Sequence, residues 1–439
     1  MSFETKDFLI TSSCMDSIQM PTILSDTDTT YKIRNFCYPN NVNPELYETI
    51  RDNRGIVFDE NDKVIFKGFN FTTEYKSDDE FIQNYELTDR NRVFESYEGT
   101  LIRLFFYKDK WFITTHRKLD AFKSKWLSQE SFGTTFKNAL KNEYVNNVDF
   151  RQKIVDQQQV DNSDIFFDTF LSLLNKSKKY CFLIENNIEN RLLTTCYNDP
   201  RVYHIGTFSD IPERSGVGPL HGADEMEIDE PLSLAPPKFQ SVCKLSDESL
   251  CMSTPRELFF STMNDLKNYV NSLDVMRSPG VIVFEEHEQF KVCSQNYKNC
   301  LALRGSFSSL KQRYIQLKLS GNQSELEEFR RIFYEDRHMF SNYEDDILLA
   351  SKEIHSIYLA RFIRKEYTFT SKEYFKIIKL CHSFYLENRD VNRVTAQVVY
   401  NIMLTMNASF LCSLLKNRGN VKATIVNQPK FDLSVSMTS

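Results

Sequence analysis

The most informative segment of this 439-residue chain is Glu95-Ser96-Tyr97-Glu98-Gly99-Thr100-Leu101-Ile102-Arg103. It places a carboxylate and a glycine directly before an apolar run, and it contains no lysine. The run extends from Leu101 to Tyr107, and a second run extends from Trp111 to Thr115 after a short polar turn. Two β-rich runs joined in this way predict a hairpin. We therefore expect residues 96–99 to form a loop that leads into a strand.

The sequence around this hairpin alternates β-rich and helical signals. Residues 55–59 and 62–67 predict a second hairpin, with Glu60-Asn61-Asp62 as its turn. Residues 134–147 and 164–178 read as helices. The stretch from about 215 to 240 contains Gly, Pro and five carboxylates, and it predicts a mobile acidic loop.

Glycine and proline usage changes sharply along the chain. After Gly321 there is no glycine until Gly419 and no proline until Pro429, while apolar residues recur every three or four positions. This pattern predicts a helical bundle, and its last helix is expected from Val394 to Leu415. The resulting domain prediction is 1–304 for a mixed domain, 305–418 for a helical domain and 419–439 for a flexible tail.

The composition is that of a soluble globular protein, with 41% apolar and 26% charged residues. The net charge of -6 argues against a protein coated by nucleic acid, because phosphate binding depends on a surplus of cations. One interpretation of Arg117, Lys118, Lys123 and Lys125 is a local basic groove. The alternative is that this stretch is an ordinary solvated face.

The ten cysteines include no CxxC pair, and the seven histidines form no pair at i,i+4 spacing, so we predict no metal site. The N-terminus lacks the pattern of a signal peptide, and no apolar stretch approaches the ~18 residues of a membrane span. These features predict a cytoplasmic protein without a membrane partner.

Several blocks in order give the chain a resemblance to RNA ligases of the bacteriophage first type, within the covalent nucleotidyltransferase superfamily. Arg54-Gly55-Ile56-Val57-Phe58 resembles the strand before the active site, and Ser96 to Gly99 occupies the place of the family's KxDG loop. Tyr180 to Glu185, with Asn190 to Leu193, resembles the motif that holds ribose and adenine. Gly280 to Val283 and Phe290 to Ser294 resemble the last two motifs.

The resemblance implies an α+β fold. A ligase-type nucleotidyltransferase domain of packed antiparallel sheets would be followed by an all-helical C-terminal domain. If the enzyme were active, ATP and Mg²⁺ would be its cofactors and an RNA end its substrate. An Asn-, Lys- and Phe-rich chain of this kind suits a large DNA virus, with the protein in the host cytoplasm or the virion.

At several positions where the family has a catalytic residue, this chain has a residue of a different chemical type. Ser96 stands at the lysine nucleophile, and a hydroxyl cannot form the nitrogen-phosphorus bond of that reaction. Glu98 replaces the aspartate, Pro279 replaces a carboxylate, and Cys293 replaces one of two phosphate-binding lysines. A shifted alignment makes Lys118 a substitute nucleophile, although Ala121 follows Asp120 where the motif has glycine.

The residues that the resemblance leaves for a nucleotide pocket are Arg54, Glu98, Gly99, Lys118, Glu185, Arg191 and Lys291. The alternative for each is ordinary surface pairing, of Arg54 with Asp59 or Glu60, and of Lys291 with Glu285, Glu286 or Glu288.

Three functions remain open at this point. The first is a catalytically degenerate RNA ligase-like protein that binds nucleotide or RNA, or acts as a scaffold. The second is an active ATP-dependent RNA ligase with a displaced lysine. The third is a structural or assembly protein without a nucleotide site, whose helical domain binds a protein partner.

Overall fold

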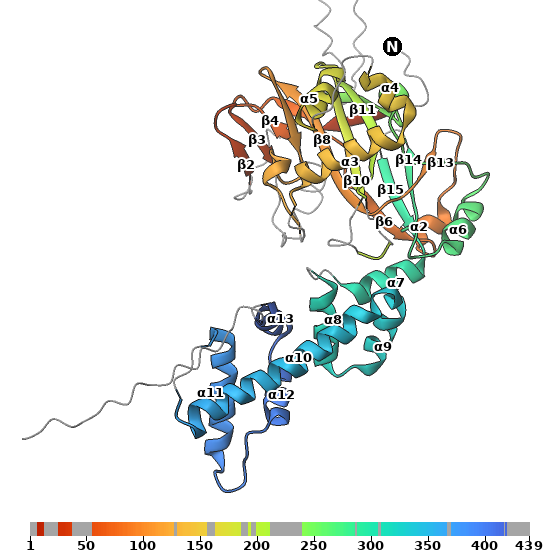
Figure 1. The fold of residues 1–439 in the computed structure, drawn as a ribbon. Coiled ribbons are helices and arrows are strands. Elements are labelled where there is room, and N and C mark those ends of the chain that lie inside the picture. The colour runs from red at the N-terminus through yellow and green to blue at the C-terminus, as the bar shows by residue number, and fades with distance from the viewer. Residues whose placement is uncertain are drawn as a thin grey trace, which may run out of the picture. The chain divides into compact units, whose positions relative to one another are not determined.

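The computed structural model describes residues 7–12, 25–36, 55–126, 130–155, 163–185, 192–194, 199–210, 239–285, 288–305, 309–366, 370–416 and 418. The chain divides into two compact units, Met1–Leu301 and Ala302–Ser439. The elements of both are labelled in Figure 1. Arg54, Arg191, residues 215–238 of the acidic stretch and the tail from 419 lie outside the described residues.

The first unit contains a six-stranded antiparallel sheet among its described residues. Its strands in order are β1 (Asp7–Ser12), β12 (Phe239–Leu245), β11 (Val202–Asp210), β10 (Lys179–Glu185), β8 (Gly99–Tyr107) and β9 (Lys110–Thr114). Three helices, α3 (Phe132–Asn146), α4 (Val148–Val155) and α5 (Ser163–Leu173), pack around Phe136, Phe170 and Phe182 on one face of it. Figure 1 shows α3 lying across β8 and β10.

Two smaller sheets complete the described part of this unit. The five-stranded sheet has the order β13 (Glu257–Leu258), β7 (Arg92–Glu95), β14 (Val281–Glu285), β15 (Glu288–Cys293) and β6 (Thr73–Lys76), and only its β15–β6 pair is parallel. The four-stranded sheet runs β2 (Ser25–Asp28), β3 (Ile33–Phe36), β4 (Val57–Phe58) and β5 (Val64–Phe66). The short helices are α2 (Glu80–Asn84), η2 (Ala121–Lys123), η3 (Glu248–Leu250) and α6 (Met263–Ser272).

A shared core joins the three sheets. Phe66, Phe94, Phe105, Phe208 and Phe284 come from all of them and pack in one cluster. The aromatic excess of the sequence is thus used largely in packing, where each ring removes a large apolar area from water. Both predicted hairpins are confirmed as β4–β5 and β8–β9.

The second unit is helical throughout its described residues. It follows α7 (Gln295–Arg304) with α8 (Leu310–Ser320), α9 (Gln323–Ile332), η4 (Tyr334–Asp336), α10 (Arg337–Tyr358), the π-helical turn η5 (Leu359–Ile363), α11 (Lys372–Glu387), α12 (Ala396–Leu404) and α13 (Ala408–Lys416). Its own core includes Ile354, Ile377 and Met403. The predicted class, antiparallel sheets followed by helices, is confirmed. None of the described helices is both long and apolar enough to cross a membrane.

One helix prediction is wrong. The helix expected from Val394 to Leu415 is two helices, α12 and α13, with a break at residues 405–407. The Asn407 side chain accepts a hydrogen bond from the Phe410 amide at 2.8 Å and so begins a new helix. Apolar residues recur at helical spacing on both sides of the break, so the sequence pattern did not predict that the helix ends there.

Candidate functional site

The loop from Ser96 to Glu98 passes from one sheet to another. It leaves β7 in the five-stranded sheet and enters β8 in the six-stranded sheet. The Ser96 amide donates to the Gly280 carbonyl at 3.0 Å, and Ser96 is 2% exposed. The loop therefore joins two of the motif blocks, because Gly280 follows Pro279 directly before β14.

Gly280 explains how closely these blocks approach. Its φ is +135°, a backbone conformation that side chains disfavour, and a Cβ there would lie 2.1 Å from the Val292 carbonyl oxygen. Only glycine fits at this place. Ser96 is thus tied by one hydrogen bond to the residue that directly precedes the strand pair β14–β15.

The carboxylate of Glu98 is buried and fully used by the protein. Its Oε2 accepts from the Leu193 amide at 3.0 Å, the Thr194 amide at 3.2 Å and the Thr194 hydroxyl at 3.1 Å. Its Oε1 accepts from the Tyr297 hydroxyl at 2.8 Å. A carboxylate offers about four lone-pair directions, so these bonds leave Glu98 little capacity for another ligand.

Tyr297 of α7 was not among the residues predicted from sequence. Burial raises the pKa of its hydroxyl, and the neighbouring Glu98 raises that pKa further, so the phenol stays protonated and donates. No motif signal marks this residue, because 199 positions separate it from its partner.

Lys291 of β15 is held inside a small ionic cluster. Its Nζ lies 3.5 Å from Glu74 of β6 and 5.3 Å from the centre of the Tyr297 ring. Lys298 donates to the same Glu74 at 2.5 Å. The alternative partners expected for Lys291 were Glu285, Glu286 and Glu288, whereas the structure pairs it with Glu74.

Two nearby pKa shifts follow from this cluster. Burial acts to raise the pKa of Glu74, but Lys291 and Lys298 outweigh it and the net shift is downward. Burial raises the pKa of the Cys293 thiol despite Lys291 beside it. Cys293 is completely buried, so it packs as a small apolar residue instead of contacting phosphate.

Glu185 and Gly99 are cross-strand neighbours on β10 and β8. A Cβ at Gly99 would lie 2.2 Å from the Ile184 carbonyl oxygen, which explains the glycine. The Oε2 atom of Glu185 is buried and accepts no hydrogen bond from any described residue. Burial raises the pKa of Glu185, Arg201 opposes that rise and Glu98 adds to it.

Lys118 belongs to a different neighbourhood. Its Nζ pairs with Asp26 of β2 at 3.0 Å, and its side chain is half exposed. Its carbonyl accepts from Thr115, whose own carbonyl accepts from Arg103. Arg103 lies four residues along β8 from Gly99, which is about 13 Å in a strand.

The structure thus brings Ser96, Glu98, Glu185, Lys291 and Cys293 to one region between two sheets, and it places Lys118 elsewhere. Among the residues that it describes, no three His, Cys, Asp or Glu side chains gather to hold a metal ion. A Mg²⁺ ion requires carboxylate oxygens that can turn toward it. The hydrogen-bonded Glu98 and the proline at 279 do not fit that requirement.

Comparison with known proteins adds viral relatives. No protein-family model matches the chain. The immediate-early protein ICP-46 homolog of Invertebrate iridescent virus 6 is 28% identical over 404 residues, or 87% of this chain and 80% of that protein. The ICP-46 homolog of Invertebrate iridescent virus 3 is 23% identical over 308 residues, or 68% of this chain and 58% of that protein. The chain therefore matches less than two thirds of the second relative.

Solved structures similar to the chain include nucleic acid ligases. A putative ATP-dependent DNA ligase from Aquifex aeolicus is 11% identical, with 84% of this chain and 85% of that chain covered at a TM-score of 0.35. Two forms of an archaeal ATP-dependent RNA ligase are 9% and 11% identical, with TM-scores of 0.33 and 0.32. Each covers 73% of this chain, and 68% and 67% of the ligase chains. Likenesses this weak establish neither a shared site nor a shared reaction.

Proposed function

We propose that the chain is an RNA ligase-like protein of the bacteriophage first type that has lost covalent nucleotidyl transfer and acts as an RNA-binding module. The observation that carries this proposal is the state of Glu98. In place of a carboxylate open to a metal ion, it is a buried acceptor for two backbone amides and two hydroxyls. Such a group stabilises the fold and is poorly suited to catalysis.

The other positions support the same conclusion. Ser96 offers no amine, and its backbone is bonded to Gly280. The charge of Lys291 is opposed by Glu74, so an incoming phosphate has to compete with a carboxylate already in place. Cys293 is buried. Each change weakens phosphate or metal binding, and together they remove the reaction.

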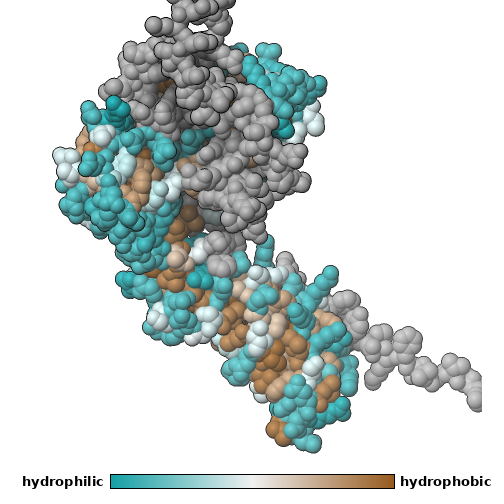
Figure 2. Space-filling model, turned by 180° about the vertical axis from the view of Figure 1, so that it is seen from behind, coloured by the Kyte–Doolittle hydropathy of each residue, from teal (hydrophilic) through white to brown (hydrophobic). Residues whose placement is uncertain are grey.

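The partners that we propose are RNA for the first unit and a protein for the helical unit, in the cytoplasm of a host cell. Figure 2 shows hydrophobic residues interspersed on the surface of the helical unit. Its exposed apolar residues include Leu348, Leu349, Leu386 and Val391.

The test is incubation of the purified protein with α-labelled ATP or GTP and Mg²⁺ or Mn²⁺, followed by denaturing electrophoresis. We expect no labelled band. An acid-labile band that survives alkali would establish a lysine phosphoramide and would overturn the proposal. Lys118→Ala and Lys291→Ala would then show which lysine carries the label.

A repair variant tests how much of the site has changed. Ser96→Lys restores the amine alone, and we expect it to remain unlabelled because Glu98, Pro279 and Cys293 stay as they are. Labelling of Ser96→Lys would mean that the rest of the site is intact. RNA binding by the unmodified protein, measured alongside Arg54→Ala and Lys291→Ala, tests the binding part of the proposal.

A further inference from the structure

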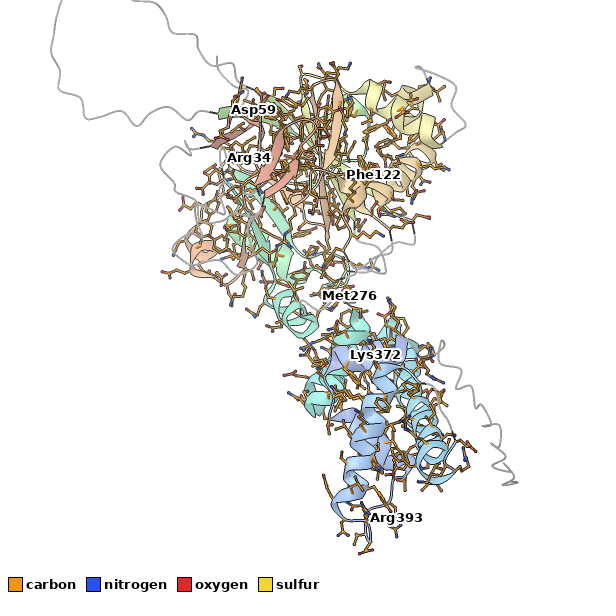
Figure 3. The ribbon with its side chains drawn as sticks, turned by 90° about the vertical axis from the view of Figure 1, so that its left-hand side faces the viewer. Arg34, Asp59, Phe122, Met276, Lys372 and Arg393 are labelled. Atoms are coloured by element: carbon orange, nitrogen blue, oxygen red, sulfur yellow. The ribbon has the colours of Figure 1, made fainter. Side chains whose placement is uncertain are left out.

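A basic and aromatic surface lies on the connection between β9 and α3, apart from the Glu98 region. We call it the η2 surface, and its members are Phe122, Lys123, Lys125 and Trp126 of the connection, together with Lys137 of α3, whose Nζ lies near the Phe122 ring. Figure 3 labels Phe122 beside the helices of the first unit. We propose that the η2 surface binds single-stranded nucleic acid by stacking bases on its aromatic rings and pairing phosphates with its cations.

The exposure of the aromatic rings is the first observation. Phe122 is 36% exposed and Trp126 is 39% exposed, although most Phe side chains of this unit are buried in its cores. Two partly exposed aromatic rings therefore lie within five residues of each other in the sequence. Base stacking on exposed rings is how single strands are held without sequence preference.

Cations alternate with these rings. Lys123 and Lys125 lie between Phe122 and Trp126 in the sequence. The Lys123 side chain is 83% exposed. Two acidic residues lie near these cations. Asp120 is 3.3 Å from Lys123, and its carboxylate also accepts from the Phe122 amide at 2.9 Å. Glu130 stands two residues before Phe132, whose amide is bonded to Ser124. The local excess of cations contrasts with the net charge of -6 for the whole chain. It favours a polyanion as the partner.

Hydrogen bonds and ring packing hold the η2 turn and Phe122 in place. Asp120 caps η2, and the Phe132 amide donates to the Ser124 carbonyl at 2.9 Å, which ties the turn to the start of α3. The Phe122 ring packs edge-on against Phe167 at 6.1 Å. Lys137 of α3 lies 5.4 Å from the centre of the Phe122 ring. Fixed rings lose little entropy when a base stacks on them.

Gly133 shows that the ring position is built into the fold. A Cβ at this residue would lie 2.5 Å from the Phe122 ring. Gly133→Ala therefore displaces the ring while leaving every charge in place. Alanine is also the better helix former inside α3, which offsets part of the cost of moving the ring, so the variant tests ring position separately from charge.

A single strand fits this surface better than a duplex. The rings can stack only on unpaired bases, whereas a duplex presents its phosphates and keeps its bases paired. RNA and DNA share this chemistry, so both are tested. The inference rests on the proposed RNA-binding function and specifies where the strand is held.

The experiment measures fluorescence anisotropy of labelled single-stranded RNA, single-stranded DNA and duplex RNA of about a dozen nucleotides with the full chain. Trp126→Ala is expected to weaken single-strand binding roughly 5- to 100-fold. Lys123→Glu with Lys125→Glu should weaken it and lower the salt slope by about 0.7 for each lysine removed. Gly133→Ala should weaken it without changing that slope.

Arg277→Glu is the matched control, because its side chain is 85% exposed and pairs with an aspartate at i,i+3, as Lys123 does. We expect this control to bind like the unmodified protein. Equal single-strand binding by all η2 variants would overturn the inference and leave the proposed function standing. Duplex bound as tightly as single strands would overturn the stacking account. No binding of RNA or DNA by the unmodified protein would overturn both proposals.

Discussion

At the scale of single residues, Glu98 is a buried carboxylate whose oxygens accept hydrogen bonds from three other residues of the protein. A carboxylate in an active site must keep an oxygen for its ligand, and the same group in a core is stable only when its lone pairs are satisfied. The bonds from Leu193, Thr194 and Tyr297 meet the second condition. The carboxylate therefore links β8, the segment after β10 and α7.

We expect Glu98→Ala to lower the free energy of unfolding by about 3 to 5 kcal/mol, because it leaves several buried donors without an acceptor. Urea denaturation at pH 7.5 measures this. Ser96→Ala, at a buried position two residues earlier, should cost about 1 kcal/mol or less. An unchanged or increased stability of Glu98→Ala would indicate a functional carboxylate held at a cost to the fold.

His204 predicts a pH dependence of stability. It is completely buried, its Nδ1 lies 3.0 Å from the Asp247 carbonyl, and its Nε2 lies 3.2 Å from the Thr207 hydroxyl. A carbonyl only accepts, so Nδ1 carries the proton and Nε2 accepts from Thr207. Burial lowers the pKa of His204 from 6.5 to about 4, with Asp247 opposing. The folded protein therefore keeps this ring neutral.

Because the unfolded chain binds the His204 proton first, stability should be full above pH 6.5 and fall as the pH is lowered toward 4. The loss is roughly 3 kcal/mol. His204→Asn keeps a donor near Nδ1 and cannot titrate, so the stability difference between it and the unmodified protein should shrink across this window. Replacing the exposed His338 should leave the profile unchanged. A constant difference for His204→Asn would contradict the assignment.

Sequence alone predicted which side-chain types stand at this site, and it did not predict the contacts that they make. The side-chain types of Ser96 and Pro279 can be read directly from the sequence, and they decide which chemistry each position can perform. The hydrogen bond from Tyr297 to Glu98 and the ion pair of Lys291 with Glu74 join distant positions. No local sequence pattern predicts contacts between such distant positions, so only the three-dimensional structure shows them.

At the scale of elements, partly buried polar contacts join neighbouring helices. Glu344 of α10 accepts from Tyr314 at 2.7 Å and Lys318 at 2.6 Å, both on α8, and from Arg330 of α9 at 2.9 Å. Apolar spacing predicted these helices, but it could not predict this junction or the break at Asn407. Periodicity reports which face is buried and leaves the partners open.

Glu344→Gln should destabilise the helical unit by about 1 to 2 kcal/mol, because the charge that holds Lys318 and Arg330 is lost while one acceptor remains. Hydrogen exchange should speed up in α8 and α9. Glu328→Gln is the control, since Glu328 pairs along α9 with the exposed Arg331 at 2.5 Å. It should cost less than about 0.5 kcal/mol. Equal effects of the two changes would mean that the junction contributes nothing specific.

At the scale of the whole molecule, each unit carries its own hydrophobic core, and this predicts two unfolding transitions. Calorimetry of the full chain with His204→Asn should move one transition, and with Glu344→Gln the other, since these residues belong to different units. The run without glycine or proline after Gly321 already predicted a separate helical region from sequence. A single transition that both variants shift together would show that the two cores unfold as one cooperative body.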